Sequence, residues 1–327
     1  MKLKFAPEPH FRALESARSI YLDAIIPLVM LLIIPFIYNG FRVLMLAALS
    51  VLTCALSEVL FCVLSRRSIT AGDLSCVITG LIIALMLPVT VPYYIAIFAG
   101  LFAVLIAKMP FGGFGRNPFN PAAAGMAFVT VCYAQEVFKY RDTKLLSHIS
   151  AFNAAEFVPV NSPAAQLAKG VRPDIVSSEM LLGNFPGPMG TTAALVIAAC
   201  ALYMIMRGTI KWQIPVCFVL SAALIAFCFP RIGGGRIDSV VFELLSGSLL
   251  FCAVFMATDP VTSPKTAWAR ALFGTACGVS TMLLRRFGAY EEGVIFAILA
   301  LNALAPALDR LVFKVKLNLA EGKGDGR

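Results

Sequence analysis

Long apolar stretches separated by short polar segments recur along the whole chain. A helix needs roughly 20 apolar residues to cross the hydrocarbon core of a bilayer, and on this basis the pattern predicts ten membrane spans. They cover residues 20–38, 43–64, 77–91, 94–109, 121–134, 192–206, 214–229, 240–257, 268–284 and 294–311. The fifth is short and begins at Pro121, so a half-helix or a tilted segment fits it as well as a complete span does. The pattern therefore indicates an all-α polytopic membrane protein.

The composition agrees with this pattern. Hydrophobic residues make up 59% of the 327 residues and charged residues only 14%, about half the charged fraction of an ordinary soluble domain. These values exclude the soluble enzyme folds. They also argue against a nucleic-acid-binding protein, because the net charge of +9 comes mostly from Lys and Arg at the ends of apolar stretches, where basic residues set membrane orientation.

The distribution of basic residues predicts that orientation. In the ten-span arrangement, 17 of the 27 Lys and Arg residues lie on the same side as the N-terminus. The other ten are Arg42, Lys139, Arg141, Lys144, Lys169, Arg172, Arg231, Arg236, Arg285 and Arg286. Five of these ten lie in the long loop at 135–189, and long loops contribute little to orientation. We therefore expect both termini in the cytoplasm and this loop on the outer side.

A short signature occurs twice. PVTVP at 88–92 and PVTSP at 260–264 share the pattern P-V-T-x-P and begin 172 residues apart, and the Phe-Gly pairs that start at Phe114 and Phe287 are 173 residues apart. With five spans in each half, the second copy would insert upside down relative to the first, as in inverted-repeat membrane proteins. The predicted regions are a first membrane repeat at 1–134, an outer loop region at 135–189, a second membrane repeat at 190–312 and a basic tail at 313–327.

The P-V-T-x-P segments predict broken helices. Two prolines within five residues remove two N–H donors and prevent a helix from continuing, and such breaks are tolerated at membrane depth only where they are buried in protein or line a cavity. An ordinary loop at a helix end is the alternative explanation. Asp259 precedes the second copy directly after an apolar run, and an acid costs about 2.5 to 3.5 kcal/mol if it enters the hydrocarbon centre. Asp259 is therefore a functional candidate.

Three further stretches combine Gly, Pro and Asn. FGGFGRNPFNPAAAG at 111–125 places Arg116, Asn117 and Asn120 before a helix that starts with proline, and backbone amides at such a start suit an anion or the edge of a cofactor. GNFPGPMGTT at 183–192 suits close approach of the backbone to a ligand. YEEGVIFAILALNALAPALDR at 290–310 covers the last span. Taken singly, each stretch is more often packing or capping.

The cysteines and histidines give no metal signature. All nine cysteines lie in or at the ends of apolar spans and no pair has CxxC spacing, so a role as small buried hydrophobic side chains is expected. His10 and His148 are isolated. We therefore expect no metal site.

In combination, the motifs FGGFGRNPFNPAAAG, MATDPVTSP at 256–264 and YEEGVIFAILALNALAPALDR resemble the RnfD/NqrB family. They are most similar to the D subunit of Rnf-type ion-translocating ferredoxin:NAD oxidoreductases, and the similarity runs from the first span to Arg310. The resemblance implies a bacterial cytoplasmic-membrane protein with a fold similar to urea transporters, which passes electrons through flavin while its complex moves Na⁺ or H⁺. Other membrane and peripheral subunits are implied as partners, since no G-x-G-x-x-G motif follows a predicted strand here.

Members of this family normally carry FMN esterified to a threonine in the motif S-[GSA]-A-T-P-L on the outer side. The corresponding stretch, VPVNSPAAQLAK at 158–169, has Ala164 or Ala165 at the acceptor position, depending on which end of the motif is aligned. An alanine methyl cannot form a phosphoester, and Ser162 matches the serine of the motif rather than its acceptor. The expected cofactor is therefore FMN without this covalent link, or riboflavin.

The resemblance also implies a set of cofactor-binding residues within these motifs. They are Arg116, Asn117, Asn120, Ser162, Ala164, Gly187, Gly190, Thr191, Thr192, Asp259, Thr262 and Ser263. Thr191 is a further departure, because similar proteins usually have a glutamate there.

A redox-inactive paralogue that works as a transporter, channel or assembly scaffold is the alternative hypothesis, because it too would lack the acceptor threonine and would share the broken helices. In that case acidic side chains would line an ion path, although charges at helix ends or interfaces explain each of them more simply. The candidates are Asp23, Glu58, Glu243, Asp259 and Asp309.

Overall fold

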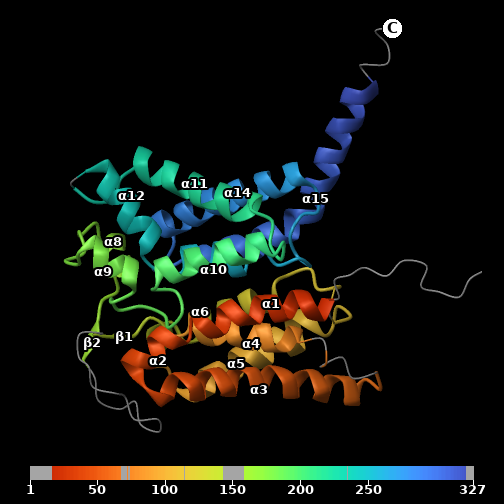
Figure 1. Cartoon of the computed structure of the whole chain (residues 1–327), viewed down its shortest axis with the longest axis horizontal. Helices are drawn as coiled ribbons and strands as arrows, with labels where there is room; N and C mark the ends of the chain where they lie inside the picture. Colours follow the sequence, from red (N-terminus) through yellow and green to blue (C-terminus); the bar gives the residue numbers. More distant parts are fainter. Residues whose placement is uncertain are drawn as a thin grey trace, which may run out of the picture.

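The computed structural model describes residues 17–67, 72, 74–113, 115–142, 158–233 and 235–321. Phe114, which marks one of the sequence repeats, lies outside these residues, as do His10, His148 and residues 143–157 of the long loop. Most of the described chain is helical (Figure 1).

The first half forms α1 (Ala17–Met30), α2 (Ile33–Asn39), α3 (Phe41–Leu64), α4 (Ser75–Met86), α5 (Tyr93–Phe102), the π-helix η2 (Ala103–Lys108) and α6 (Pro121–Cys132). The long loop contains α7 (Ala134–Val137), β1 (Tyr140–Arg141), β2 (Pro159–Val160), α8 (Pro163–Ala168) and α9 (Ser177–Leu182). The second half forms α10 (Ala194–Met206), α11 (Gln213–Cys228), α12 (Arg236–Leu245), α13 (Leu249–Phe255), α14 (Ala267–Phe287) and α15 (Val294–Glu321). The two strands pair antiparallel, with Tyr140 opposite Val160, which is a small departure from the all-α prediction.

Four helical segments are long and apolar enough to cross a membrane: Arg18–Asn39, Phe41–Leu64, Ala267–Phe287 and Val294–Asn318. The pair α12 and α13 passes the same test if it is counted as one bent span. The other five predicted spans coincide with shorter apolar helices, from Ser75–Met86 to Gln213–Cys228. Large apolar side chains are exposed on the outside of the bundle, among them Leu56 at 66% and Leu220 at 63%. The chain is therefore an integral membrane protein, while the number of complete spans remains a prediction.

The helices end before both P-V-T-x-P segments, as these segments predict, whereas Pro27 and Pro306 lie inside helices. α4 ends at Met86, two residues before Pro88, and α13 ends at Phe255, before Pro260. The predicted span 240–257, in contrast, was wrong as a single helix, because α12 and α13 meet at an angle of 56°. Gly247 in this bend has φ of +69°, a conformation that glycine adopts without strain, and a Cβ there would overlap the carboxylate of Glu292.

Each half packs its helices in a similar way. In the first half α3 packs against α4 and α5, and α5 against α6; in the second half α11 packs against α13 and α14, and α14 against α15. Glycines allow the closest approaches. A Cβ on Gly80 of α4 would lie 2.6 Å from the Cα of Val51 in α3, and one on Gly274 of α14 would lie 2.5 Å from the carbonyl oxygen of Ile214 in α11. Small residues serve this purpose between membrane helices, where apolar burial does not drive association.

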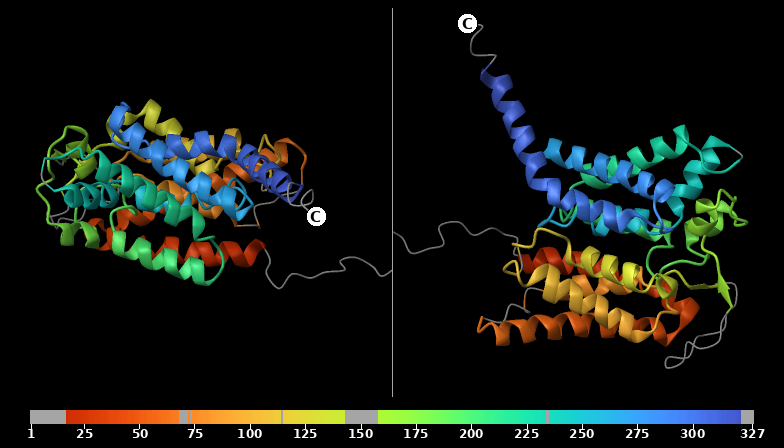
Figure 2. Two further views of the ribbon diagram at one scale, coloured as in Figure 1. Left: turned by 90° about the horizontal axis from the view of Figure 1, so that it is seen from above. Right: turned by 180° about the vertical axis from the view of Figure 1, so that it is seen from behind.

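The bundle has two ends, which we name by what they carry. The strand end carries β1, β2 and α8, and the termini end carries the start of α1 and the far part of α15, which projects beyond the other helices (Figures 1 and 2). α4 begins at the termini end, where its first residue Ser75 contacts Lys108. α13 begins at the strand end, where its N-cap Ser248 contacts Glu292. The half-helices α4 and α13 therefore enter the bundle from opposite ends and point their C-termini toward its middle.

Candidate functional site

The first broken segment, residues 87–92, is held by a buried arginine of α3. Arg42 is 2% exposed; its Nε donates to the carbonyl oxygen of Val89 at 2.7 Å and its Nη2 to that of Val91 at 2.9 Å. The guanidinium also lies 4.6 Å from the ring centroid of Tyr93. Carbonyl groups freed by a proline break need such donors away from water. Sequence reasoning missed Arg42, although a basic residue at the start of an apolar run was the available signal.

The glycine-rich stretch 183–192 packs against the same break. The backbone N–H of Gly190 donates to the carbonyl oxygen of Leu85 at 2.7 Å, and that of Met189 donates to Leu87 at 3.1 Å. A Cβ on Gly190 would overlap the side chain of Leu85. The close backbone approach expected for this stretch therefore occurs against α4 of the same chain. Thr191 is buried beside it, and its hydroxyl has no hydrogen-bond partner among the described residues.

A pocket opens beside this segment at the strand end. Its lining joins the first P-V-T-x-P copy to the glycine-rich stretch and to β1. The lining residues are Ile34, Pro35, Tyr38, Asn39, Pro88, Val89, Thr90, Tyr140, Arg141, Gly183, Phe185, Gly187, Pro188, Met189 and Thr192. Two of the predicted site residues, Gly187 and Thr192, therefore lie in this strand-end pocket.

The second broken segment is organised by Asp259. Its carboxylate accepts hydrogen bonds from the backbone N–H of Val261 at 3.3 Å and from the hydroxyl of Thr262 at 3.0 Å. The backbone N–H of Ser263 donates to the Asp259 carbonyl oxygen at 3.1 Å. Asp259, Thr262 and Ser263 thus form one turn after α13, in which Asp259 satisfies backbone and hydroxyl donors.

Asn120 connects the two halves of the chain. It is the N-cap of α6, where its Oδ1 accepts from the backbone N–H of Ala123 at 3.2 Å, and its Nδ2 donates to the carbonyl oxygen of Met256 at 3.1 Å. An asparagine at the N-cap satisfies a backbone donor that a helix start leaves open. The FGGFGRNPFNPAAAG and MATDPVTSP motifs therefore meet at a hydrogen bond between residues 136 positions apart.

A second and larger pocket lies at the termini end, between α1, α4, α10 and the second broken segment. The space, including its opening, measures about 740 Å³. It is lined by Ile20, Tyr21, Ala24, Leu28, Ser75, Ile78, Thr79, Ile82, Lys108, Asn117, Asn120, Pro121, Ala122, Met204, Thr209, Ile210, Phe255, Thr258, Asp259, Pro260 and Val261. Three predicted site residues, Asn117, Asn120 and Asp259, line this termini-end pocket. Arg116 does not, because it is exposed on the loop outside it.

A buried ion pair closes one side of the termini-end pocket. Lys108 Nζ donates to Glu58 Oε2 and to Ser75 Oγ, each at 2.6 Å, and the side chains of Lys108 and Glu58 are 2% and 0% exposed. The π-helix η2 delivers Lys108 to this place, and π-turns often mark functional positions. Glu58 was among the acids considered for an ion path, whereas Lys108 was not predicted as a site residue.

The segment expected to carry flavin forms the short helix α8. Ser162 caps it, accepting from the backbone N–H of Ala165 at 3.0 Å and donating from its own hydroxyl to Glu291 Oε2 at 2.6 Å. Ala164 and Ala165 are both buried. Glu291 lies in the turn between α14 and α15, where burial raises the pKa of its carboxyl to about 7 although the Ser162 hydrogen bond opposes the shift. Ser162 therefore has a capping and bridging role in this segment.

A network of buried charges occupies the bend between α12 and α13. Arg231 Nε lies 3.0 Å from Glu243 Oε1, and Arg285 Nη1 lies 3.4 Å from Glu243 Oε2. Arg285 also donates to the carbonyl oxygen of Ser246 at 3.0 Å. Sequence reasoning missed both arginines as partners of Glu243, because the residues of this network come from three separate segments. Among the described residues, no cluster of His, Cys, Asp and Glu side chains could hold a metal ion.

Comparisons with known proteins agree with this arrangement of motifs. Residues 4–318 match the model of the NQR2, RnfD, RnfE family. The chain is 31% identical over 313 residues to the D subunit of the Na⁺-translocating ferredoxin:NAD⁺ oxidoreductase complex of Acetobacterium woodii, covering 95% of this chain and 93% of that one. It is 28% identical to the D subunit of the proton-translocating ferredoxin:NAD⁺ oxidoreductase complex of Clostridium ljungdahlii, with 94% of each chain covered. Because the family match extends over nearly the whole sequence, the chain belongs to the NQR2, RnfD, RnfE family.

Proposed function

We propose that this chain is the D-type membrane component of an ion-translocating ferredoxin:NAD oxidoreductase complex and that it passes electrons through flavin between neighbouring subunits. The observation that carries the proposal is the similarity over 94% or more of the chain to two relatives whose names describe such complexes. One of these relatives is named for Na⁺ and the other for protons. The proposal therefore names ion translocation as a class and leaves the ion open.

We further propose ten membrane segments in two inverted repeats, related to the urea-transporter fold, in the bacterial cytoplasmic membrane with both termini in the cytoplasm. The corresponding helix contacts of the two halves support the repeats. The opposed half-helices α4 and α13 support the inversion, since two copies with opposite topology would enter from opposite faces. Several segments are short because proline breaks end them before a full crossing.

The termini-end pocket fits an isoalloxazine ring better than the strand-end pocket does. Its walls are mainly apolar, from residues such as Ile78, Ile82 and Ile210, and a few polar groups face it. Thr209 lines it with a buried hydroxyl that has no partner among the described residues, so a ligand carbonyl or ring nitrogen would satisfy a group that is otherwise costly to bury. Apolar walls with a few fixed polar groups are typical of cofactor sites.

In this proposal the flavin accepts and releases electrons, and the residues of the chain bind and orient it. Thr209 and Asn117 would contact the polar edge of the ring, and the isoleucines would exclude water from its faces. Lys108 would hold one wall of the pocket through its ion pair with Glu58 and its hydrogen bond to Ser75. Asp259 keeps the opposite wall in place through its own turn.

Acid denaturation tests the proposal and the absence of a covalent link together. The complex is purified from its native membrane, the flavin absorption is recorded, and acid is added to separate polypeptide from supernatant. We expect the yellow colour in the supernatant. A colourless protein would contradict electron transfer through flavin in this subunit and favour a transporter or scaffold. Colour that remains with the polypeptide would contradict a noncovalent cofactor.

Restoring the acceptor threonine tests the covalent link separately, because α8 lies at the strand end and the termini-end pocket lies at the opposite end of the bundle. Ala165→Thr and Ala164→Thr are compared in a host that attaches FMN to related subunits, with a relative that keeps the threonine as the positive control. We expect flavin fluorescence on the denatured band for one variant only, since one alignment of the motif is correct. Because both alanines are buried beside Ser162, thermal stability is measured in parallel, so that misfolding is separated from a lack of attachment.

A further inference from the structure

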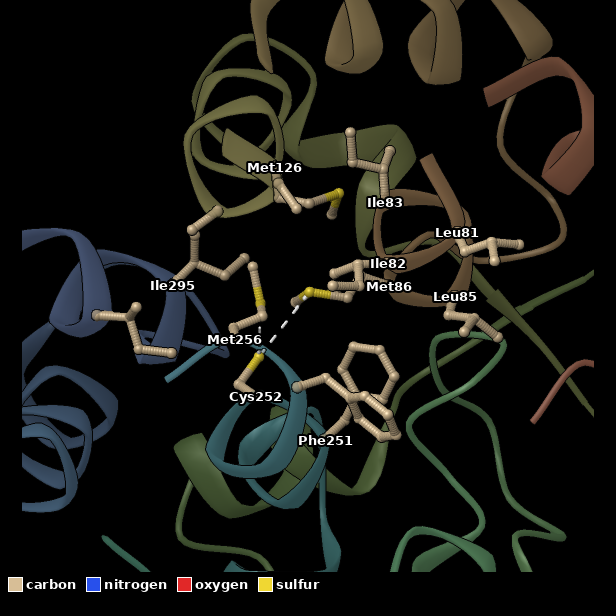
Figure 3. Packing of buried hydrophobic residues seen from close by; sticks show 14 of the residues in the cluster. Leu81, Ile82, Ile83, Leu85, Met86, Met126, Phe251, Cys252, Met256 and Ile295 are labelled. Carbon is tan, nitrogen blue, oxygen red and sulfur yellow. Dashed lines mark hydrogen bonds between the residues drawn. The ribbon is translucent and has the colours of Figure 1, made fainter. Parts of the chain in front are cut away.

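Three sulfur atoms meet where the two half-helices approach each other. Cys252 Sγ lies 3.4 Å from Met256 Sδ and 3.9 Å from Met86 Sδ. Figure 3 shows the three sulfur atoms facing one another, with Met126 of α6 beside them. Cys252 and Met256 are fully buried and Met86 is 3% exposed. The electron-transfer proposal uses none of these side chains.

The position of this sulfur cluster (Cys252, Met256 and Met86) favours positive charge. Met86 is the last residue of α4 and Met256 is the C-cap of α13, so the cluster lies between the C-terminal ends of two half-helices. The C-terminus of a helix carries about half a negative elementary charge. Two such ends converge here among apolar side chains, and Glu292 is close enough to Cys252 to interact with it electrostatically. A cation at this position is therefore favoured electrostatically, provided that its ligands suit the chemistry of the ion.

We propose that Cys252, Met86 and Met256 form a binding site for a soft monovalent cation, Cu(I). Thiolate and thioether sulfur are the ligands that select Cu(I) over hard cations. Binding exchanges the thiol proton for the metal: the S–H bond of Cys252 breaks, a Cu–S bond forms, and one proton is released. The thiolate and Cu(I) together carry no net charge, so the filled site avoids the large cost of an isolated ion in an apolar interior.

The separations of Cys252 Sγ from the two methionine sulfurs are close to what a site with three sulfur ligands requires. With metal–sulfur bonds of about 2.3 Å, three sulfurs around one metal ion in a plane lie about 4 Å apart. The observed separations of 3.4 and 3.9 Å need only small side-chain movements to reach this value. Methionine has three rotatable bonds and adapts readily. Bound Cu(I) would then link α4 in the first half to α13 in the second half.

A small cavity on the strand-end side of the cluster reaches Met86. It is lined by Met86, Met126 and Val137 among others, and by the polar side chains of Thr130, Tyr140 and Glu292. The Thr130 hydroxyl is buried and has no hydrogen-bond partner among the described residues. The absence of CxxC spacing hid this site from sequence reasoning, because Cys252 and Met86 are 166 positions apart.

Metal retention by the purified complex tests the proposal. To remove other reactive thiols, the exposed Cys132 and Cys228 and the partly exposed Cys217 are replaced by serine in the starting background. Cu(I) is added without oxygen as its acetonitrile complex, the protein is desalted into a Cu(I) chelator, and bound copper is measured by mass spectrometry. We expect one Cu(I) per chain to resist the chelator, and at least a tenfold loss of retained copper in Cys252→Ser.

Matched variants identify the ligands. Cys277→Ser removes an equally buried thiol from α14 and should leave retention unchanged. Met86→Leu and Met256→Leu nearly conserve volume, so they should fold while releasing copper to lower chelator concentrations, even if Cys252→Ser proves unstable. Equal retention in the starting background and in both methionine variants would overturn the proposal, as would the absence of chelator-resistant Cu(I). Copper bound through oxygen or nitrogen in the X-ray absorption spectrum would also overturn it.

Discussion

The buried pair Lys108–Glu58 depends on both partners. Each side chain is almost completely inaccessible and the charged atoms are 2.6 Å apart, so removing one partner leaves an unpaired charge in a dry interior. Such a loss typically costs about 3 to 5 kcal/mol, whereas removing both partners is often close to neutral. We therefore expect Lys108→Met to lower the melting temperature of the detergent-solubilised complex strongly and the double variant with Glu58→Gln to recover most of it. Equal melting temperatures for the single and double variants would contradict this account.

Glu291 should make stability depend on pH. Burial raises the pKa of its carboxyl from 4.5 to about 7 in the folded chain, so between these values the folded state holds a proton that the unfolded state has lost. Stability from this group is therefore greatest below pH 4.5, falls as the pH rises through this window, and is constant above it. We expect the melting temperature of the wild type to fall from pH 5 to pH 8 relative to Glu291→Gln.

A control for this pH prediction comes from the same end of the bundle. Glu179→Gln changes a carboxylate in α9 outside the turn that holds Glu291, and it should leave the pH profile of the wild type unaltered. Parallel profiles for the wild type and Glu291→Gln would contradict the assignment. Ser162→Ala should extend the pH dependence to higher pH, because the hydrogen bond from the Ser162 hydroxyl lowers the pKa of this carboxyl.

The contact between α11 and α14 depends on the absence of side chains. A Cβ on Gly278 would overlap the hydroxyl of Ser221 and the carbonyl oxygen of Phe218. Alanine normally stabilises an exposed helix by about 1 kcal/mol relative to glycine, but Gly278→Ala should instead lower the melting temperature, because the two backbones must separate. Gly233→Ala makes the same chemical change where nothing lies within 4 Å and should have little effect. A stabilised Gly278→Ala protein would contradict the packing.

The helix ends before Pro88 and Pro260 were predictable from the sequence, whereas the bend at Gly247 was not. Pro88 and Pro260 cannot continue a helix, so the ends of α4 and α13 follow from local chemistry. The bend at Gly247 lies within an apolar run that reads as one span, and only the fold shows that a Cβ there would overlap the carboxylate of Glu292, 45 positions later. The short π-helix that directs Lys108 inward has no recognisable sequence signal. Local rules therefore predicted the apolar segments, while tertiary contacts determined where some of them bend.

The proposed inverted arrangement predicts on which side of the membrane each end lies. Lys169 follows α8 at the strand end, and Lys211 lies in the turn between α10 and α11 at the termini end. Only α10 among the long helices separates them, so they should be on opposite faces. In chains whose own accessible cysteines are replaced, we expect a membrane-impermeant maleimide to label Lys169→Cys in intact cells and Lys211→Cys only after the membrane is opened. Labelling of both in intact cells would contradict the inversion.

The candidate site was predictable only in part, because its members are brought together from the whole chain. Asn117 and Asn120 were predicted from one motif and Asp259 from another, and the structure places all three on one pocket. The sequence could not indicate that Thr209, in an ordinary helix turn, faces the same space. Nor could it place Arg116, which lies in a predicted motif but is exposed outside the pocket. The sequence motifs identified the segments that line the pocket, whereas the fold determined which of their side chains face it.

The opposed directions of α4 and α13 also bear on the membrane potential. Two half-helices pointing the same way would give the bundle a net dipole along its axis. A voltage across the membrane would then favour one orientation of that dipole over the opposite one. Two opposed half-helices nearly cancel, so the field exerts little net torque on the pair. A cation moving toward the middle passes from a positive to a negative helix end from either face. The two half-helices by themselves therefore favour neither direction, and in the proposed complex the direction of net ion movement would be set by the redox state or by the applied gradient.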